Sequence, residues 1–398
     1  MQKNSFRFLA VGQSLANLGD VLYIVALISL LYAQTASVFI TSLVPLVNVT
    51  ARVISGLVAP LVLEKVQHVW ILRITQIAKT AVLFFGALGF QQLPLWIVFG
   101  FVALLSFLDG WAVPARQSLI PRIVANGELV RANGLLATAD QTMQFVGWSS
   151  GGVLVTLIGS NNVLWLSVSL YAAASLFMLL LHANDNAHAH EKERGRPIRS
   201  AGEVMKEGWL HLWQNHSLRL LTMMDVLEGL AGAIWMSAIL LVYVKQGLGQ
   251  GDEWWGYINA SYMLGTIIGG MVVVAMAGWM EKSLYRLMLI GIIGCCLLTL
   301  SFGMFAYPFV ALGISFLLGP FYQVQFVTKQ TAVQQLTDPE KLSKVFSAKD
   351  TMDTIVFGLS VLLMGALAEW YGVSVVYYAG AGLFAGSAIL LRYLKGKS

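Results

Sequence analysis

Charged residues are scarce in this chain. Asp, Glu, Lys and Arg make up 11% of the 398 residues, whereas hydrophobic residues make up 57% and the mean hydropathy is +0.72. A water-soluble domain of this size carries far more charge on its surface. The composition therefore excludes a soluble globular protein and indicates a chain that is solvated by lipid.

Several chemical signatures are also missing. The two cysteines, Cys295 and Cys296, are adjacent, so they cannot build a disulfide framework. No phosphate-binding Gly-x-x-x-x-Gly-Lys motif is present, which argues against direct use of ATP. His182, His188 and His190 have no carboxylate or cysteine partner at a recognisable ligand spacing, so we interpret them as part of a solvated loop. Neither a cofactor nor a metal site is expected.

Long apolar runs recur along the whole chain instead. Each has 18 or more residues and can cross the roughly 30 Å hydrocarbon core as a helix, whereas open sheets cannot satisfy their edges in lipid. The expected spans are 8–32, 37–61, 69–90, 94–117, 134–158, 161–182, 218–243, 254–278, 284–306, 308–331, 347–369 and 373–392. The N-terminal segment has no small-residue cleavage site, so we interpret it as a retained first helix. The pattern predicts an all-α membrane protein with twelve transmembrane helices.

A polar stretch, HANDNAHAHEKERGRPIRS, separates the first six spans from the last six. It cannot enter the bilayer and is typical of a solvated linker. Val204, Trp209, Leu212 and Trp213 then share one helical face, which predicts an amphipathic helix at the membrane surface. The expected parts are an N-terminal bundle (1–182), a linker with this helix (183–216) and a C-terminal bundle (217–398).

The distribution of basic residues predicts the orientation. Of the 25 Lys and Arg residues, Lys245 alone falls in one set of loops, Arg52 and Lys79 lie within spans, and the remaining 22 are assigned to the other side. The positive-inside rule makes that side the cytoplasm, with both termini on it, in a multi-pass protein of the plasma membrane. The same rule explains the pI of about 9.1 without nucleic acid as a partner.

An internal repeat supports two related halves. Residues 116–134 align without gaps with residues 329–347, at a constant offset of 213. The conserved pairs are Arg116/Lys329, Gln117/Gln330, Ser118/Thr331, Leu129/Leu342 and Arg131/Lys344. Both segments leave the fourth span of a half and enter the fifth. Their place predicts two pseudo-symmetric six-helix bundles related by an axis along the membrane normal.

Five segments carry a resemblance to a known family. They are GQSLANLGD (12–20), PARQSLIPR (114–122), GELVRANGL (127–135), KEGWLHLWQNHSLRLL (206–221) and LTDPEKLSKVFS (336–347). Together they resemble the Major Facilitator Superfamily, in the branch that contains macrolide-efflux proteins and enterobactin-type siderophore exporters. The resemblance implies the major facilitator fold, alternating access and a secondary transporter rather than an enzyme.

Two motifs depart from the pattern of that family. Between spans two and three, Pro60, Glu64, Lys65 and His68 stand where the family usually has a glycine, an Asp-Arg pair and further basic residues. The span-five motif at 147–152 lacks the proline of the antiporter-type sequence. Gating and coupling roles that the family assigns to these motifs do not transfer directly.

Ionisable residues inside spans are costly and indicate function. Gln13, Asn17 and Asp20 share one face of span one, and we expect Asp20 to pair with Arg52 of span two across the interface, with Asn48 beside it. The alternative is a static ion pair that only holds two helices together.

Span seven carries two further carboxyl groups, Asp225 and Glu228. A carboxyl in an apolar cavity can bind a proton from one side of the membrane and release it to the other as hydration changes. The sequence therefore indicates Asp20, Glu228 and Asp225 as candidates for proton coupling.

A second group of charges is expected near the cytoplasmic ends of the spans. Asp109 and Arg116 lie seven residues apart on one face of span four, where charges from spans five and eleven should gather. The predicted gate of ion pairs comprises Glu64, Lys65, Asp109, Arg116, Asp140, Lys329, Asp350 and Asp353, with Lys349 nearby. Lys79 has no assigned role, because third spans usually pack at the periphery of this fold.

Polar and aromatic side chains within the spans predict a substrate cavity. The candidates are Gln13, Asn17, Asn48, Arg52, Gln144, Trp148, Asn259, Tyr262, Tyr322 and Gln325. Aromatic walls with a few hydrogen-bonding groups are typical of small-molecule sites. Ordinary helix packing is the alternative for any one of them.

These features favour a proton-coupled exporter of amphipathic, drug- or macrolide-like molecules. Export of a siderophore or metallophore is the alternative, in which Arg52 and Lys79 would supply the positive charge that an anionic chelate needs. A membrane-embedded enzyme lacks a visible metal cluster or Ser/His pair, and a passive channel does not explain two related halves with buried carboxylates. The expected partners are the lipid bilayer, protons and a small-molecule substrate, and the expected state is a monomer.

Overall fold

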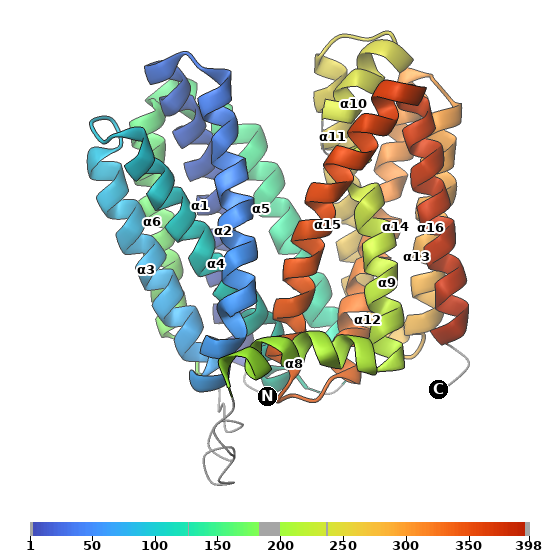
Figure 1. Ribbon diagram of the computed structural model, residues 1–398, viewed down its shortest axis with the longest axis horizontal. Helices are drawn as coiled ribbons and strands as arrows, with labels where there is room; N and C mark the ends of the chain where they lie inside the picture. The colour runs from blue at the N-terminus through green and yellow to red at the C-terminus, as the bar shows by residue number, and fades with distance from the viewer. Residues whose placement is uncertain (1–2, 126, 183–199, 236–237, 395–398) are drawn as a thin grey trace. The chain divides into compact units, whose positions relative to one another are not determined.

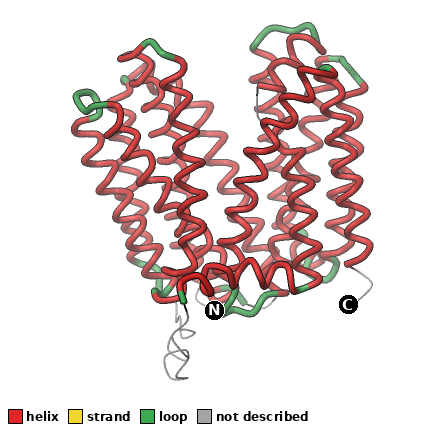
Figure 2. The backbone as a smooth tube through the Cα atoms, viewed as in Figure 1, coloured by secondary structure: helices red, strands yellow, loops and turns green. Residues whose placement is uncertain are grey.

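The computed structural model describes residues 3–125, 127–182, 200–235 and 238–394, and this part of the chain consists of helices joined by short loops (Figures 1 and 2). The first half forms α1 (Lys3–Thr35), α2 (Val38–Lys65), α3 (His68–Gly89), α4 (Leu95–Ile123), α5 (Leu129–Ile158) and α6 (Ser160–Leu179). Ten helices of the described chain are long and apolar enough to cross a membrane, or eleven if a bent pair in the second half counts as one. α5, 30 residues long, occupies the remaining predicted position.

The second half begins with α8 (Ala201–Gln214) and α9 (His216–Gly232). Beyond them lie the 3-10 turn η1 (Ala233–Trp235), α10 (Ala238–Val242), the π-helical turn η2 (Tyr243–Gly247), α11 (Glu253–Ala275), α12 (Ala277–Met280), α13 (Leu284–Met304), α14 (Pro308–Leu336), α15 (Leu342–Tyr371) and α16 (Val373–Leu394). The predicted all-helical class with twelve spans is confirmed. The predicted seventh span, 218–243, corresponds to two helical segments, His216–Trp235 and Ile239–Gly247, which are bent by 48° relative to each other and together are long and apolar enough to cross a membrane.

The helix boundaries repeat along the chain. α14, α15 and α16 begin 213 residues after α4, α5 and α6, respectively, which is the offset found in the sequence repeat. α4 and α14 also end 213 residues apart, as do α5 and α15. The aligned segments 116–134 and 329–347 therefore occupy the same place between two helices. Their superposition about an axis along the membrane normal stays a prediction.

The chain forms two compact units. Unit 1 comprises 1–125, 142–210 and 338–351, and unit 2 comprises 126–141, 211–337 and 352–398. The beginning of α5 thus belongs to unit 2 and the beginning of α15 to unit 1. The division predicted from the linker did not include this exchange of helix ends. Most of the linker, including His188 and His190, lies outside the described residues.

The predicted amphipathic helix is α8. Val204 and Leu212 are buried, whereas Trp213, which was expected on the same face, is exposed. Gly208 lies between them, and a Cβ atom there would be 2.2 Å from the carbonyl oxygen of Lys344 in unit 1. Only glycine lets α8 lie this close to the backbone of α15.

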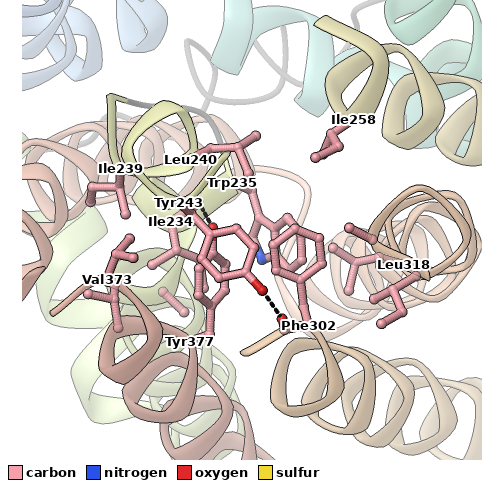
Figure 3. Packing of buried hydrophobic residues seen from close by; sticks show 14 of the residues in the cluster. Ile234, Trp235, Ile239, Leu240, Tyr243, Ile258, Phe302, Leu318, Val373 and Tyr377 are labelled. Carbon is pink, nitrogen blue, oxygen red and sulfur yellow. Dashed lines mark hydrogen bonds between the residues drawn. The ribbon is translucent and has the colours of Figure 1, made fainter. Parts of the chain in front are cut away.

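Unit 2 has an aromatic core (Figure 3). The ring centroids of Phe302 lie 4.8 Å from Trp235, 5.0 Å from Tyr243 and 4.9 Å from Tyr377, distances typical of favourable aromatic packing. The Tyr243 hydroxyl donates a hydrogen bond of 2.5 Å to the carbonyl oxygen of Phe302. This core packs against the broken seventh span and anchors its irregular end to α13 and α16.

Close backbone contact joins α11 to α14. A Cβ atom on Gly265 would lie 2.1 Å from the carbonyl oxygen of Phe316, and one on Gly319 would lie 2.3 Å from the backbone of Gly265. Small residues at helix interfaces are the usual means of tight packing in membranes, where apolar burial alone does not drive helices together.

We expect Gly319→Ala to destabilise unit 2 by about 1–3 kcal/mol, because the added methyl group has to push α11 and α14 apart. Gly313→Ala, in the same helix, is the matched control, since a Cβ atom there meets no atom within 4 Å. Thermal unfolding of both purified variants tests this. Equal melting temperatures would contradict the close contact.

Candidate functional site

Unit 1 contains a buried lysine that is shared between two carboxylates. Lys79 Nζ lies 2.9 Å from Asp20 Oδ1 and 2.7 Å from Asp109 Oδ1. The Tyr171 hydroxyl donates a hydrogen bond to Asp20 Oδ1, and Lys79 Nζ lies 4.9 Å from the centroid of the Tyr171 ring. We call Asp20, Lys79, Asp109 and Tyr171 the first cluster.

Four helices supply the first cluster. Asp20 comes from α1, Lys79 from α3, Asp109 from α4 and Tyr171 from α6. The neighbouring Gly19 makes the arrangement possible, because a Cβ atom there would lie 2.7 Å from the Tyr171 ring. The cluster thus ties α1, α3, α4 and α6 together at one point.

Unit 2 contains a second arrangement of the same chemistry. Lys329 Nζ lies 2.7 Å from Asp225 Oδ1 and forms a close ion pair with Glu228 Oε2. The Ser387 hydroxyl donates a hydrogen bond of 2.6 Å to Glu228 Oε1. We call Asp225, Glu228, Lys329 and Ser387 the second cluster.

The two clusters share a pattern but not their positions. In each, a carboxylate of the first helix of that half accepts hydrogen bonds from a lysine and from a hydroxyl group of the sixth helix. The lysine belongs to the third helix in unit 1 (Lys79) and to the fourth helix in unit 2 (Lys329). The second cluster is therefore not a copy of the first by simple repetition of the sequence.

Charge and exposure distinguish the clusters. Each holds two carboxyl groups and one ammonium group, so one negative charge is left over if both acids are ionised, and an uncompensated buried charge is costly. The side chains of Asp20 and Asp109 are 25% and 28% exposed, whereas those of Asp225 and Glu228 are only 10% and 8% exposed. The acids of the first cluster are thus partly exposed, whereas those of the second are nearly closed.

The predicted Asp20–Arg52 pair is wrong. Asp20 pairs with Lys79, and Arg52 lies 3.6 Å from Asp350. The sequence already indicated a functional role for Lys79, since an ionisable residue within a span is costly and usually functional. It was left out because the third helix was assumed to be peripheral, yet α3 packs against α4 and α6 and its lysine points inward.

Two residues predicted for the gate lie in the clusters instead. Asp109 binds Lys79, and Lys329, which was counted among the cytoplasmic basic residues, is buried between Asp225 and Glu228. The other predicted gate residues are Glu64 and Lys65 at the end of α2, Arg116 in α4, Asp140 in α5, and Asp350 and Asp353 in α15. Their gating role stays a prediction.

A second ion-pair network in unit 1 was not foreseen. Lys344 Nζ, at the start of α15, lies 2.7 Å from Glu207 of α8 and 3.4 Å from Glu64 of α2. One turn later, the Ser347 hydroxyl donates a hydrogen bond of 2.6 Å to the carbonyl oxygen of Gly56. Together with Arg52–Asp350, these contacts fasten the beginning of α15 to unit 1.

The cavity candidates divide between the units. Gln13, Asn17, Asn48, Arg52, Gln144 and Trp148 belong to unit 1, and Asn259, Tyr262, Tyr322 and Gln325 belong to unit 2. Gln13 donates a hydrogen bond of 2.6 Å to Asn17, as their spacing on one helical face suggests. In unit 2, the rings of Tyr262 and Tyr322 lie 6.3 Å apart. Their place in one substrate cavity stays a prediction.

The comparisons with known proteins agree with this fold. Residues 9–348 match the model of the Major Facilitator Superfamily, so the chain belongs to that family of membrane transporters. It is 32% identical to the MFS-type transporter YfmI of Bacillus subtilis over 95% of this chain and 93% of that protein. It is 21% identical to the multidrug efflux pump Tap of Mycolicibacterium fortuitum over 69% of this chain and 66% of Tap.

Solved structures show the same fold at low sequence identity. The human organic anion transporter MFSD10 has a TM-score of 0.75 at 12% identity, over 98% of this chain and 99% of that one. A bacterial homologue of the iron transporter ferroportin has a TM-score of 0.74 at 14% identity, over 99% and 100%. The chain is thus a multi-pass membrane transporter of small molecules and not an enzyme.

No group of three or more His, Cys, Asp or Glu side chains within the described residues is arranged to hold a metal ion. The acids of both clusters contact lysine instead.

Removing the shared lysine should destabilise unit 1 strongly. We expect Lys79→Met to cost about 3–5 kcal/mol, because two partly buried carboxylates lose a buried counter-ion. Lys245→Met is the matched control: Lys245 lies 2.8 Å from Asp252, but the pair is exposed and such pairs contribute little. Thermal unfolding in detergent measures both effects. If the two variants melt alike, Lys79 is not a structural counter-ion.

Proposed function

We propose that this chain is a proton-coupled exporter that moves amphipathic small molecules out of the cytoplasm by alternating access. The observation that carries the proposal is the sharing of one buried lysine between two carboxylates in each unit. A proton removes the remaining negative charge of such a cluster with the smallest change in its packing. Gain and loss of that proton can therefore be linked to a change of conformation.

Asp20 and Glu228 are the proposed proton carriers, with Asp225 as a second acid beside Glu228. Both carriers lie in the first helix of their half and contact a lysine and a hydroxyl group. When either acid is protonated, its lysine can bind the other carboxylate alone. The ion pairs then change without breaking the cluster.

The charges favour neutral or cationic cargo. Lys79 and Lys329 are buried and already bound to carboxylates, whereas the acids of the first cluster are partly exposed. An anionic siderophore or metallophore needs accessible positive charge, for which Arg52 is the available candidate, and Arg52 lies beside Asp350. The similarity to Tap and the resemblance to macrolide-efflux proteins support drug-like cargo. Export of a chelate is the second candidate, because the branch that the sequence resembles also contains enterobactin-type exporters.

We assign the beginning of α15 to a cytoplasmic gate. The charge distribution of the loops supports a plasma-membrane protein with both termini in the cytoplasm. We further propose that the chain acts as a monomer. On that orientation, the ion pairs of Lys344 with Glu64 and Glu207, and of Arg52 with Asp350, close the cytoplasmic side. Opening toward the cytoplasm requires that they break.

Amide replacement separates coupling from folding. Asp20→Asn and Glu228→Gln keep the shape of each side chain and lose its titration, so we expect transport driven by a pH gradient to fall at least tenfold while substrate binding persists. Inverted vesicles with an imposed gradient measure transport, and binding and melting are measured on the same purified variants. Gradient-driven transport at the wild-type rate in both variants would exclude these acids as carriers.

Neutralising the gate lysine should shift the conformational equilibrium. We expect Lys344→Met to lengthen the distance between a spin label at the end of α2 and one at the beginning of α15, because Glu64 and Glu207 lose their partner. Lys341→Met is the control, since Lys341 lies in the same segment but pairs with Asp338 at 3.7 Å in an exposed position. Unchanged distances in Lys344→Met would remove this lysine from the gate.

A further inference from the structure

Gln325 is the most unusual polar side chain in the interior of unit 2. It lies in α14 and is only 1% exposed, yet neither its amide nitrogen nor its amide oxygen has a hydrogen-bond partner within the described structure. Leaving a buried amide without partners costs several kcal/mol, and buried side-chain polar atoms are nearly always paired. The amide therefore offers both a donor and an acceptor to a bound molecule.

The position of Gln325 connects it to the second cluster. Lys329 follows four residues later, so the two side chains lie on neighbouring parts of one face of α14, about 6 Å apart along the helix axis. On the other side, a Cβ atom on Gly291 of α13 would lie 2.8 Å from Cβ of Gln325. Close packing of α13 thus fixes the stem of Gln325 and directs the side chain into the interior of unit 2.

Polar groups on several helices of unit 2 lie around the second cluster. Asp225 and Glu228 come from α9, Lys329 and Tyr322 from α14, Cys295 from α13, Tyr262 from α11 and Ser387 from α16. Cys295 and Tyr322 both lie within electrostatic range of Glu228 and Lys329, and Asp353 of α15 acts on Tyr322. Lys329, about one turn from Gln325, belongs to this polar group, and a buried amide beside it can be satisfied by water, which usually makes about three hydrogen bonds when buried in a protein.

We propose that Gln325 binds a water molecule inside unit 2 and that this water passes protons to and from the second cluster. This inference rests on the proposed role of Glu228 as a proton carrier and adds the route by which the proton arrives. Gln325 is a positioning residue in this scheme: its amide carries no proton itself but holds the water that does. The ligand is water-sized, because a side chain with 1% exposure is closed to a larger substrate.

The transfer balances without any further reactant. A proton leaves a hydronium ion at Gln325 as its O–H bond breaks, and a new O–H bond forms on a carboxylate oxygen of the second cluster. The carboxylate loses its negative charge, and the water left behind remains bound to the amide. Release reverses these steps, and the proton passes to the next water on the way to bulk solvent.

Two variants test the role of the amide. Gln325→Met keeps the length of the side chain and removes its hydrogen bonds, whereas Gln325→Asn keeps the amide with one methylene group fewer. Gln323→Met is the matched control: Gln323 is also 1% exposed and its amide nitrogen has no partner in the described structure, but its Cβ faces Gly269 of α11. Gln323 lies two residues away, on the other side of α14.

The probe is the proton itself. A caged proton is photolysed in a suspension of the purified full chain, and the infrared band of protonated carboxyl groups is followed in time. Loss of the band in Glu228→Gln or Asp225→Asn assigns it to the second cluster. We expect protonation to be about tenfold slower in Gln325→Met, near the wild-type rate in Gln323→Met and partly restored in Gln325→Asn.

The outcomes are distinguishable. A wild-type rate in Gln325→Met would overturn the water link and leave Glu228 as a carrier. The absence of any band that depends on Glu228 or Asp225 would overturn both the carrier and the link. Equal slowing in Gln325→Met and Gln323→Met would mean that packing of α14, rather than bound water, controls the rate. Melting temperatures of all variants confirm that each is folded before its rate is compared.

Discussion

A buried ammonium group shared between two carboxylates is the interaction on which the rest of this structure depends. In an apolar interior, neither a lone lysine nor a lone carboxylate is tolerated, so each charge fixes the position of the others. Lys79 thereby holds α1, α3 and α4 at one point, and Tyr171 adds α6. Lys329 joins α9 to α14, and Ser387 adds α16. The charges that stabilise each unit are thus also ionisable groups of its interior, so we propose that folding and coupling share residues.

The two clusters differ in exposure, and we propose different tasks for them. The acids of the first cluster are about one quarter exposed, whereas those of the second are nearly closed, and their lysine, Lys329, lies about one helical turn from Gln325 in α14. An exposed acid can meet both protons and the positive charge of a substrate. A closed one can exchange only something as small as a proton. We propose that proton exchange in each cluster changes the conformation of its unit, and the ion pairs of Lys344 are contacts within unit 1 that such a change can break.

The sequence predicted the helices better than their contacts. Hydropathy located the spans within a few residues, because it depends on local composition, and the 213-residue offset of the sequence repeat recurs in the bounds of α14 and α15. The Asp20–Arg52 pair failed because partner choice depends on how α3 packs, which periodicity does not encode. Lys344 was missed since it looks like an ordinary loop lysine, and only Gly208 brings α8 close enough for Glu207 to reach it. No proline occurs in residues 216–247, so the sequence gives no sign of the bend after α9.

The central claim is that each cluster carries one exchangeable proton, and proton binding by the purified protein tests it most directly. Wild type and the Asp20→Asn/Glu228→Gln double variant are titrated between the same mildly acidic and mildly alkaline limits, without substrate. We expect the wild type to bind about two more protons than the double variant over this range, one for each cluster. Identical proton uptake by the two proteins would contradict the account, because the clusters would then be permanent ion pairs and the proton would have to be carried elsewhere.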